Sequence, residues 1–321
     1  MDDNAHVLAR SQSAVRFLRD RFAPTRLAHS SALSERVGSP AYLKLETELP
    51  TGSFKVRGAL FALWAKLQRE QVAQVVAAST GNHGAAVAWA ARELGISAQI
   101  FVPVGANAVK TARIKSLGAQ LAEIGADIEG ARRAAEAHAE ASGAYLLDDA
   151  TSADVPAGAG TIGLEVAEQC PDCATIVVPV GDSALIRGVA AGAKARLPNV
   201  RVVGVQAANA PAYYRSWQSG EVVTTETAAT MADGLATTTP TAENVAAIRA
   251  LVEEMVLVTE DEMLQAMRWL VAEERMVVEP AAAAPVAALL QPARQWPGPI
   301  VAIITGQNLA PELVSGVTST R

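Results

Sequence analysis

Regular alternation of strand-like and helix-like segments is the feature that most restricts the fold of this chain. Short apolar runs predict strands, and a longer segment with helical periodicity follows most of them. The expected strands cover residues 42–46, 75–79, 98–102, 120–124, 144–147, 175–180, 201–205, 255–258 and 300–304. Three of the predicted helices are each followed by a glycine, as helix C-termini commonly are. These glycines are Gly95, Gly118 and Gly143. Alternation with short connections indicates right-handed βαβ units on parallel sheets.

The alternation is interrupted by a loop of small and acidic residues over 148–160, and this break indicates two lobes. A chain of 321 residues is long enough for two. We expect an α/β protein in which a small lobe, residues 71–148, is inserted into a large lobe formed by residues 1–70 and 149–321. Within the first 40 residues we expect one helix, over 10–21, and then a loop. Ligands of such folds bind beyond the carboxyl ends of the strands, so the loops there are the candidate sites.

Charge and apolar content exclude several classes of partner. The formal net charge is −6 and charged residues make up 19% of the chain, so we expect no basic field for nucleic acid or anionic lipid. No apolar run is long enough to cross a bilayer, and the N-terminus does not read as a signal or transit peptide. We therefore expect a cytoplasmic protein. Cys170 and Cys173 lie between a predicted helix and a predicted strand, which favours a turn over a redox or zinc site.

Lys55 is the first candidate for chemistry. It stands between the turn-forming residues 50–53 and an apolar helical run over 59–64. The positive end of a helix dipole disfavours an ammonium, and we therefore expect the neutral amine to be favoured. A neutral amine is the form that attacks a carbonyl to make a Schiff base. A solvated lysine in a loop is the alternative that this spacing alone leaves open.

Loops after other predicted strands supply complementary groups. Residues 79–84 and 181–184 each follow a strand, are rich in small residues and lead into a helix, which is the geometry of an anion site. The first would fit a carboxylate and the second a phosphate, although ordinary capped turns have the same pattern. Thr305 follows the last strand and brings a hydroxyl to the same crevice. Together with Lys55, these parts suit pyridoxal 5'-phosphate (PLP) acting on an amino acid.

Residues 158–163 formally match the dinucleotide-binding pattern G-x-G-x-x-G. That pattern carries meaning only directly after a buried strand. Here it follows a polar segment that is interrupted by Pro156. A nicotinamide- or flavin-dependent oxidoreductase is therefore the least favoured function.

On these residues the chain resembles the serine/threonine dehydratase family of fold-type II PLP enzymes. The matching segments are residues 50–59, 79–84, 157–165, 178–181, 232–236, 279–281 and 305–308. The resemblance implies two three-layer α/β/α lobes with parallel sheets. It also implies β-elimination from a β-hydroxy amino acid such as threonine or serine, giving a 2-keto acid and ammonia.

The resemblance further implies a role for individual residues. Lys55 would form the internal aldimine and take the Cα proton, with Phe54 packed against the cofactor ring. Asn82 would bind the 3-oxygen of the ring, and Thr305 would face the pyridine nitrogen. The phosphate would be held by Gly181, Asp182, Ser183, Ala184 and Leu185. The substrate carboxylate would be lined by Ser79, Thr80, Gly81 and His83.

Departures from the family pattern leave alternatives open. Asp182 stands where the family has glycine, and it would repel a phosphate unless its side chain turned away or Ser183 compensated. Gln206 and Ala212 stand where cation-binding relatives carry carboxylates, so we expect no metal there. Thr80 stands where racemases carry a serine, so amino-acid racemisation stays an alternative. A non-catalytic binding protein with this fold is a further alternative. Relatives are often dimers, which makes a homodimer the expected assembly.

Overall fold

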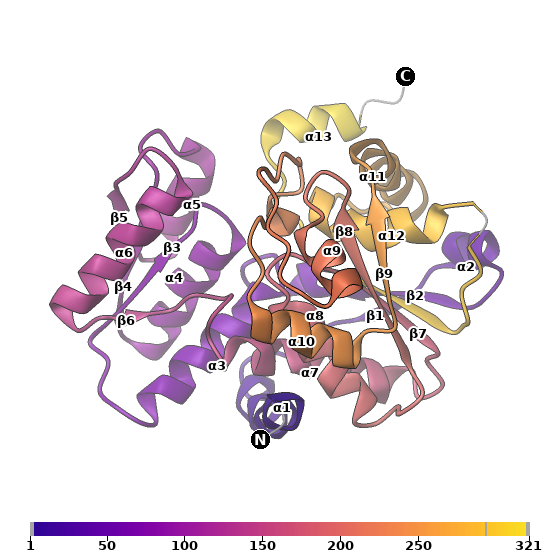
Figure 1. Cartoon of the computed structure of the whole chain (residues 1–321), viewed down its shortest axis with the longest axis horizontal. Coiled ribbons are helices and arrows are strands. Elements are labelled where there is room, and N and C mark those ends of the chain that lie inside the picture. The colour runs from indigo at the N-terminus through magenta and orange to yellow at the C-terminus, as the bar shows by residue number, and fades with distance from the viewer. Residues whose placement is uncertain (1–2, 293, 319–321) are drawn as a thin grey trace.

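The computed structural model, which describes residues 3–292 and 294–318, contains two separate sheets (Figure 1). The larger sheet has the strand order β1 (Leu27–His29), β2 (Ala41–Leu45), β10 (Ile300–Ile304), β7 (Thr175–Pro179), β8 (Arg201–Ala207), β9 (Glu254–Val258). The smaller sheet has the order β5 (Gln120–Glu123), β4 (Ser97–Val102), β3 (Gln74–Ala78), β6 (Tyr145–Leu146). All neighbouring strands run parallel except β1, which is antiparallel to β2.

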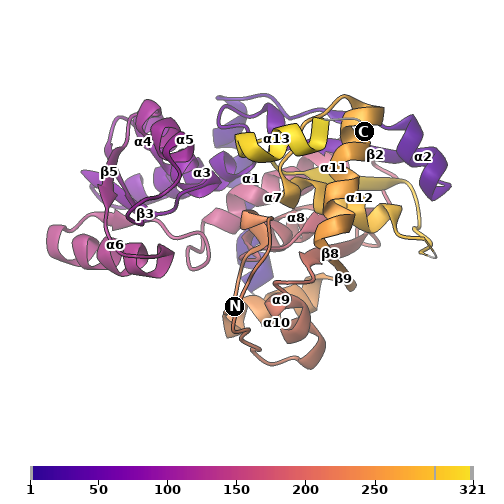
Figure 2. The same ribbon diagram turned by 90° about the horizontal axis from the view of Figure 1, so that it is seen from above.

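Helices cover the two sheets and fill the space between them. They are α1 (Asp3–Arg19), α2 (Ser31–Val37), α3 (Lys55–Leu67), α4 (Asn82–Leu94), α5 (Ala108–Ser116), α6 (Ile128–Ser142), α7 (Val155–Gln169), α8 (Ala184–Lys194), α9 (Ala212–Ser219), α10 (Ala242–Leu251), α11 (Glu260–Glu274), α12 (Pro280–Leu290) and α13 (Pro311–Thr318), with short 3₁₀ turns η1 (Glu46–Glu48) and η2 (Asp233–Leu235). Figures 1 and 2 both place α4, α5 and α6 with the small sheet on one side of the molecule.

The α/β prediction is confirmed, and each predicted strand is present within two residues of its expected bounds. The prediction of a loop after the first helix is wrong, because β1 and α2 lie there. The first helix also begins and ends earlier than expected. The two sheets divide the strands as the predicted lobes do. One apolar core joins α3 to α4 and the small sheet, so α3 packs against both parts, and the exact lobe boundaries stay a prediction.

The G-x-G-x-x-G segment lies inside α7 and is fully buried. Its glycines allow close helix packing. A Cβ on Gly158 would lie 2.4 Å from the backbone oxygen of Arg57, and one on Gly163 would lie 2.1 Å from that of Val189. The segment therefore brings α7 against α3 and α8 and forms no loop that could bind a dinucleotide. The cysteine pair lies between the end of α7 and β7, as expected of a turn.

A buried network of charges fixes the helix that Lys55 begins. The Arg57 guanidinium donates to Glu46 at 2.7 Å and to Glu165 at 2.6 Å, and Lys44 donates to Glu165 at 2.6 Å. All four side chains are at most 4% exposed. The network joins β2, η1, α3 and α7, and so holds the start of α3 against the large sheet.

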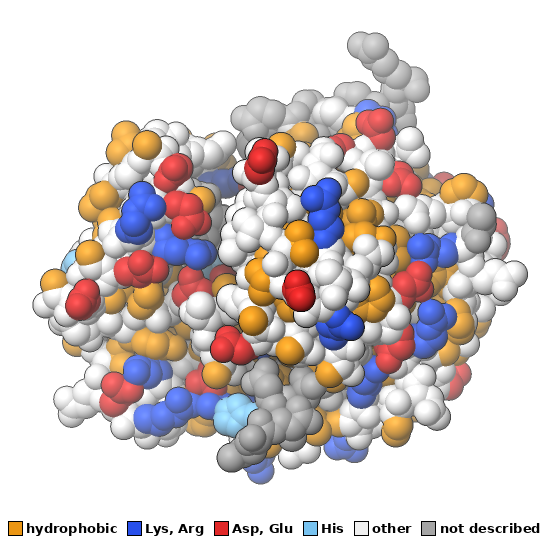
Figure 3. Space-filling view, viewed as in Figure 1, with side chains coloured by type: hydrophobic (Ala, Val, Ile, Leu, Met, Phe, Trp, Pro, Cys, Tyr) orange, Lys and Arg blue, Asp and Glu red, His pale blue; other side chains and the backbone are white. Residues whose placement is uncertain are grey.

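The surface carries both signs of charge interspersed, with no large basic field on the face seen in Figure 3. Over the described part of the chain, no helix combines the length and the apolar character that crossing a membrane requires.

Candidate active site

Loops at the carboxyl ends of strands in both sheets meet around Lys55. The residue before it, Phe54, donates its backbone N–H to the Thr305 oxygen at 2.9 Å. Ser53 and Gly306 form an isolated antiparallel bridge beside this contact. The loop after β10 and the start of α3 are thereby held together, as a shared crevice requires.

The Lys55 amine lies between two carboxylates. Its Nζ atom is 2.5 Å from Asp149 Oδ2 and 2.7 Å from Asp182 Oδ2, and the Phe54 ring centroid is 5.3 Å away. Burial lowers the pKa of Lys55, but the charges of Asp149 and Asp182 outweigh it and raise the pKa above its usual range. The expectation of a favoured neutral amine is wrong for this arrangement, because two full charges outweigh a helix dipole.

The predicted phosphate loop connects β7 to α8. Asp182 Oδ1 accepts a hydrogen bond from the Ala184 N–H at 2.8 Å, so the carboxylate lies at the N-terminus of α8 as well as on Lys55. Gly181 is required by space, since a Cβ there would lie 2.1 Å from the Gly234 oxygen. Ser183 has a left-handed backbone, with φ of 77°, and its buried hydroxyl has no hydrogen-bond partner among the described residues. The Asp182 side chain does not turn away from the loop.

Side chains from α9 and α10 support this loop from behind. The Tyr213 hydroxyl donates to the Asp182 backbone oxygen at 3.1 Å, and it accepts from Asn244 Nδ2 at 3.2 Å. Asn244 also donates to the Ala150 oxygen at 3.3 Å. The loops that carry Asp149 and Asp182 are therefore tied to each other through the buried Asn244 side chain.

The predicted carboxylate loop connects β3 to α4. Within it, Ser79 Oγ accepts from the Gly81 N–H at 3.2 Å. The buried His83 donates from Nε2 to the Leu147 oxygen at 2.8 Å, and its Nδ1 is 3.6 Å from Asp149 Oδ2. Among the described residues, no hydrogen bond joins the Ser79 or Thr80 side chain to Lys55. The substrate role of this loop stays a prediction.

Asn82 joins the two lobes. Its amide nitrogen donates to both carboxyl oxygens of Glu279, at 2.8 and 2.9 Å, and its oxygen accepts from Asn308 Nδ2 at 2.6 Å. Arg113 on α5 binds the other side of Asn308 and donates to the Thr51 oxygen at 2.7 Å. The Asn82 carboxamide is thus fixed by hydrogen bonds to Glu279 and from Asn308.

Sequence reasoning missed Asp149, Glu279 and Asn308 as members of this cluster. Glu279 and Asn308 lay in segments that match the family, so a signal was present although it implied no role. Asp149 lay in the loop that breaks the alternation, where nothing in the local pattern distinguishes it from Asp148.

Glu279 is expected to make the stability of the protein depend on pH. Burial raises its pKa to about 7, although the Asn82 amide opposes this shift. A carboxyl whose pKa is raised on folding stabilises the fold below its unfolded pKa, and this contribution is lost as the pH rises through the folded value. We expect Glu279→Gln to gain melting temperature relative to wild type as the pH rises from about 5.5 to about 8.5. The control is Glu93→Gln, which changes an exposed side chain. If the melting temperatures of wild type and Glu279→Gln changed in parallel with pH, Glu279 would not be the group that causes the pH dependence.

At the expected metal-free position, the Gln206 carboxamide oxygen accepts from the Tyr214 N–H at 2.8 Å, which fixes the start of α9 beside β8. Ala212 is the first residue of α9. Over residues 3–292 and 294–318, no group of three histidine, cysteine or acidic side chains is placed to hold a metal.

The absence of a metal at this position stays a prediction. Dialysis against EDTA should leave the activity unchanged, and activation by magnesium would contradict the prediction.

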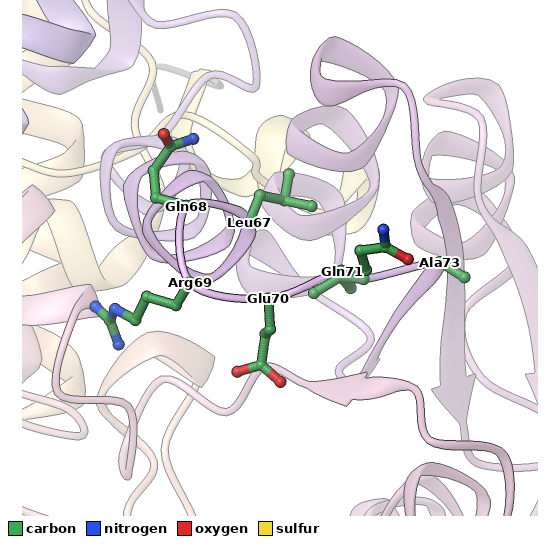
Figure 4. Close-up of a pocket in the computed structure, with 7 residues that line it drawn as sticks. Leu67, Gln68, Arg69, Glu70, Gln71 and Ala73 are labelled. Atoms are coloured by element: carbon green, nitrogen blue, oxygen red, sulfur yellow. The ribbon is translucent and has the colours of Figure 1, made fainter.

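A surface hollow of 600 Å³ lies elsewhere, between the end of α3 and β3 (Figure 4). It is lined by the consecutive residues 67–73 and includes none of the side chains around Lys55. It is therefore a separate feature of the surface.

Comparison with known proteins supports the resemblance. Residues 18–306 match the family model described as "Pyridoxal-phosphate dependent enzyme". The chain is 37% identical to an L-threonine ammonia-lyase of Geobacter sulfurreducens, over 94% of this chain and 75% of that protein. It is similar to the processed form of threonine deaminase isoform 2 from Solanum lycopersicum (TM-score 0.92, 29% identity, 99% and 88% of the two chains). It is also similar to maize serine racemase (TM-score 0.90, 29% identity, 96% and 95%).

Proposed function

Since the chain belongs to the family of pyridoxal-phosphate dependent enzymes, we propose that it is a PLP-dependent ammonia-lyase acting on a β-hydroxy amino acid such as threonine or serine. The products are a 2-keto acid and ammonia. The observation that carries the proposal is the Lys55 amine, which lies at the strand ends within the segment that resembles the family. The threonine ammonia-lyase similarity over most of the chain supports the same reaction.

The residues around Lys55 fit the cofactor. A primary amine is present for its aldehyde. The N-terminus of α8 binds an anionic group, the Asp182 carboxylate, and a phosphate held there would have to displace that carboxylate from the Ala184 N–H. The hydroxyls of Ser53 and Ser183 are buried and have no hydrogen-bond partner among the described residues. Ser53 lies two residues before Lys55, and Ser183 follows Asp182, which contacts the amine. A phosphate would satisfy the Ser183 hydroxyl and the amides of the first turn of α8. We propose Gly181, Asp182, Ser183, Ala184 and Leu185 as the phosphate loop.

When bound, PLP supplies an aldehyde for the lysine and an electron sink for the substrate Cα. The chain's own residues do the rest. Lys55 Nζ takes the Cα proton, and the resulting ammonium is stabilised by Asp149 and Asp182. Asn82, held by Glu279 and Asn308, would orient the ring, and Phe54 would pack against it. Thr305 would offer the pyridine nitrogen a neutral hydroxyl, which would not stabilise a protonated ring.

We propose that the substrate carboxylate binds to the loop of Ser79, Thr80, Gly81 and His83 at the N-terminus of α4. Backbone N–H groups at a helix start favour an anion, and the small residues allow close approach. Thr80 is the side chain that we propose for proton transfer on the face opposite Lys55.

Racemisation is the second candidate function. The similarity to maize serine racemase over 96% of this chain favours it, and so does the Thr80 hydroxyl. Deuterium uptake at Cα, with recovery of the opposite enantiomer and no keto acid, would replace the lyase proposal by this one.

The test is a panel of β-hydroxy amino acids of both configurations, assayed for ammonia and keto acid. We expect equal amounts of the two products from at least one member. Absence of visible imine absorbance in the purified protein would identify a non-catalytic binding protein instead. We further propose a cytoplasmic homodimer; light scattering in solution and fractionation of cells test these two statements.

A further inference from the structure

The carboxylates on the Lys55 amine come from different segments. Asp149 lies in the loop between β6 and α7, and Asp182 lies in the loop between β7 and α8. The exposed fraction of the side chain is 14% for Lys55, 18% for Asp149 and 21% for Asp182. At this burial a charge pair is screened little by solvent, so both contacts act strongly on the amine.

The other groups around the amine do not cancel this negative charge. The Asp149 oxygen that accepts from Lys55 also lies 3.6 Å from His83 Nδ1. Asp182 is bound to the Ala184 N–H, and Glu279 is bound to Asn82. Burial alone would raise the pKa of Asp149, but His83 and Lys55 outweigh burial and lower the pKa below its usual value, so Asp149 is a carboxylate. For Asp182, burial dominates and raises the pKa. Asp149 is accordingly the stronger partner of the ammonium.

An ammonium held in this way has two opposite effects on the chemistry. To bond to an aldehyde carbon, the nitrogen must lose its extra proton, and the carbonyl oxygen then leaves as water with the two remaining protons. Carboxylates that stabilise the ammonium oppose this step. When the free amine later takes a proton from the substrate Cα, the same carboxylates stabilise the product of that transfer.

Among the hydrogen bonds of the described residues, the backbone N–H at the start of α8 donates to Asp182 and none there donates to Asp149. Its side chain can therefore be changed without removing the cap on Ala184. We propose that Asp149 is a positioning residue that stabilises the protonated form of the Lys55 amine, and that it thereby opposes the covalent link to the cofactor and assists removal of the substrate Cα proton. This inference rests on the proposed function.

The test compares wild type with Asp149→Asn, which has the same shape and no charge. Loss of a carboxylate at this distance is expected to lower the lysine pKa by about one unit or more, and one unit is about tenfold in an equilibrium. At neutral pH we expect the apparent Kd for PLP, read from the absorbance of the linked cofactor, to fall by about tenfold. We expect the rate of Cα-deuterium loss from the substrate to fall by about tenfold or more. The pKa of Lys55, read by NMR of labelled lysine, should also fall.

Asp149→Glu should restore wild-type values of all three readouts, because it restores the charge. Asp148→Asn is the matched control. Asp148 accepts from the Ala150 N–H at 2.9 Å, which asparagine also does, and the ion pairs of Lys55 among the described residues are with Asp149 and Asp182. If Asp149→Asn does not fold, Asp149→Ser removes the charge with less bulk and gives the same readouts. The proposal would be overturned if Asp149→Asn bound PLP more weakly and also lost Cα-deuterium more slowly than wild type. It would also be overturned if neither the apparent Kd for PLP nor the rate of deuterium loss changed. Wild-type protein that never links PLP would overturn the proposed function instead.

Discussion

Lys55→Ala protein is expected to show no absorbance from covalently linked PLP and to lose turnover by at least about 10³-fold. The substitution removes both the group that bonds to the aldehyde and the base that takes the Cα proton, and general base catalysis alone contributes about 10²–10⁴-fold. Turnover is measured as keto acid formation on the best substrate of the panel. The visible spectrum is recorded on the same samples with PLP in excess.

Lys66→Ala is the matched control, because Lys66 lies on the same helix, is partly exposed and pairs with the exposed Glu70. It is expected to keep both the spectrum and the activity. Loss of less than tenfold in Lys55→Ala, or an unchanged visible spectrum, would mean that another lysine carries the chemistry.

Arg57→Met is expected to lower the free energy of unfolding by about 3–5 kcal/mol. The substitution leaves the carboxyl groups of Glu46 and Glu165 buried without their main partner, and such breakage of a buried pair is costly. Unfolding in urea, followed by circular dichroism, gives the free energy. Because α3 begins with Lys55, the same variant is expected to bind PLP less well.

The control for Arg57 is Arg19→Met, which removes an exposed pair with Glu168. Pairs of this kind contribute about 0–1 kcal/mol. If Arg57→Met unfolded at the same urea concentration as Arg19→Met, the buried network would not be what fixes the start of α3.

The strand and helix pattern could be predicted from sequence because each parallel strand is a short apolar run between helices with capped ends. The glycines that end α4 and α6 have left-handed backbones, as their positions indicated. β1 could not be predicted in this way. It has three residues, lies at the sheet edge and owes its existence to pairing with β2, which is a tertiary contact.

The site shows the same division. Loops 79–83 and 181–185, with Thr305, could be located because small residues between a strand and a helix are visible in the sequence. The charge state of Lys55 could not, because it is set by Asp149 and Asp182, which lie 94 and 127 residues farther along the chain. The helix dipole can be inferred from the local sequence, whereas these two stronger charges cannot. The hydrogen bond from the Ala184 N–H to the Asp182 carboxylate could not be predicted either, because it depends on the direction of the Asp182 side chain.

We propose Lys55 as the residue that captures the cofactor, and this can be tested directly. Protein equilibrated with PLP is reduced with borohydride, digested, and mapped by mass spectrometry for the lysine that carries the reduced pyridoxyl group. We expect a single modified peptide, with the label on Lys55. A label on any other lysine, or no label in protein that binds PLP, would contradict it.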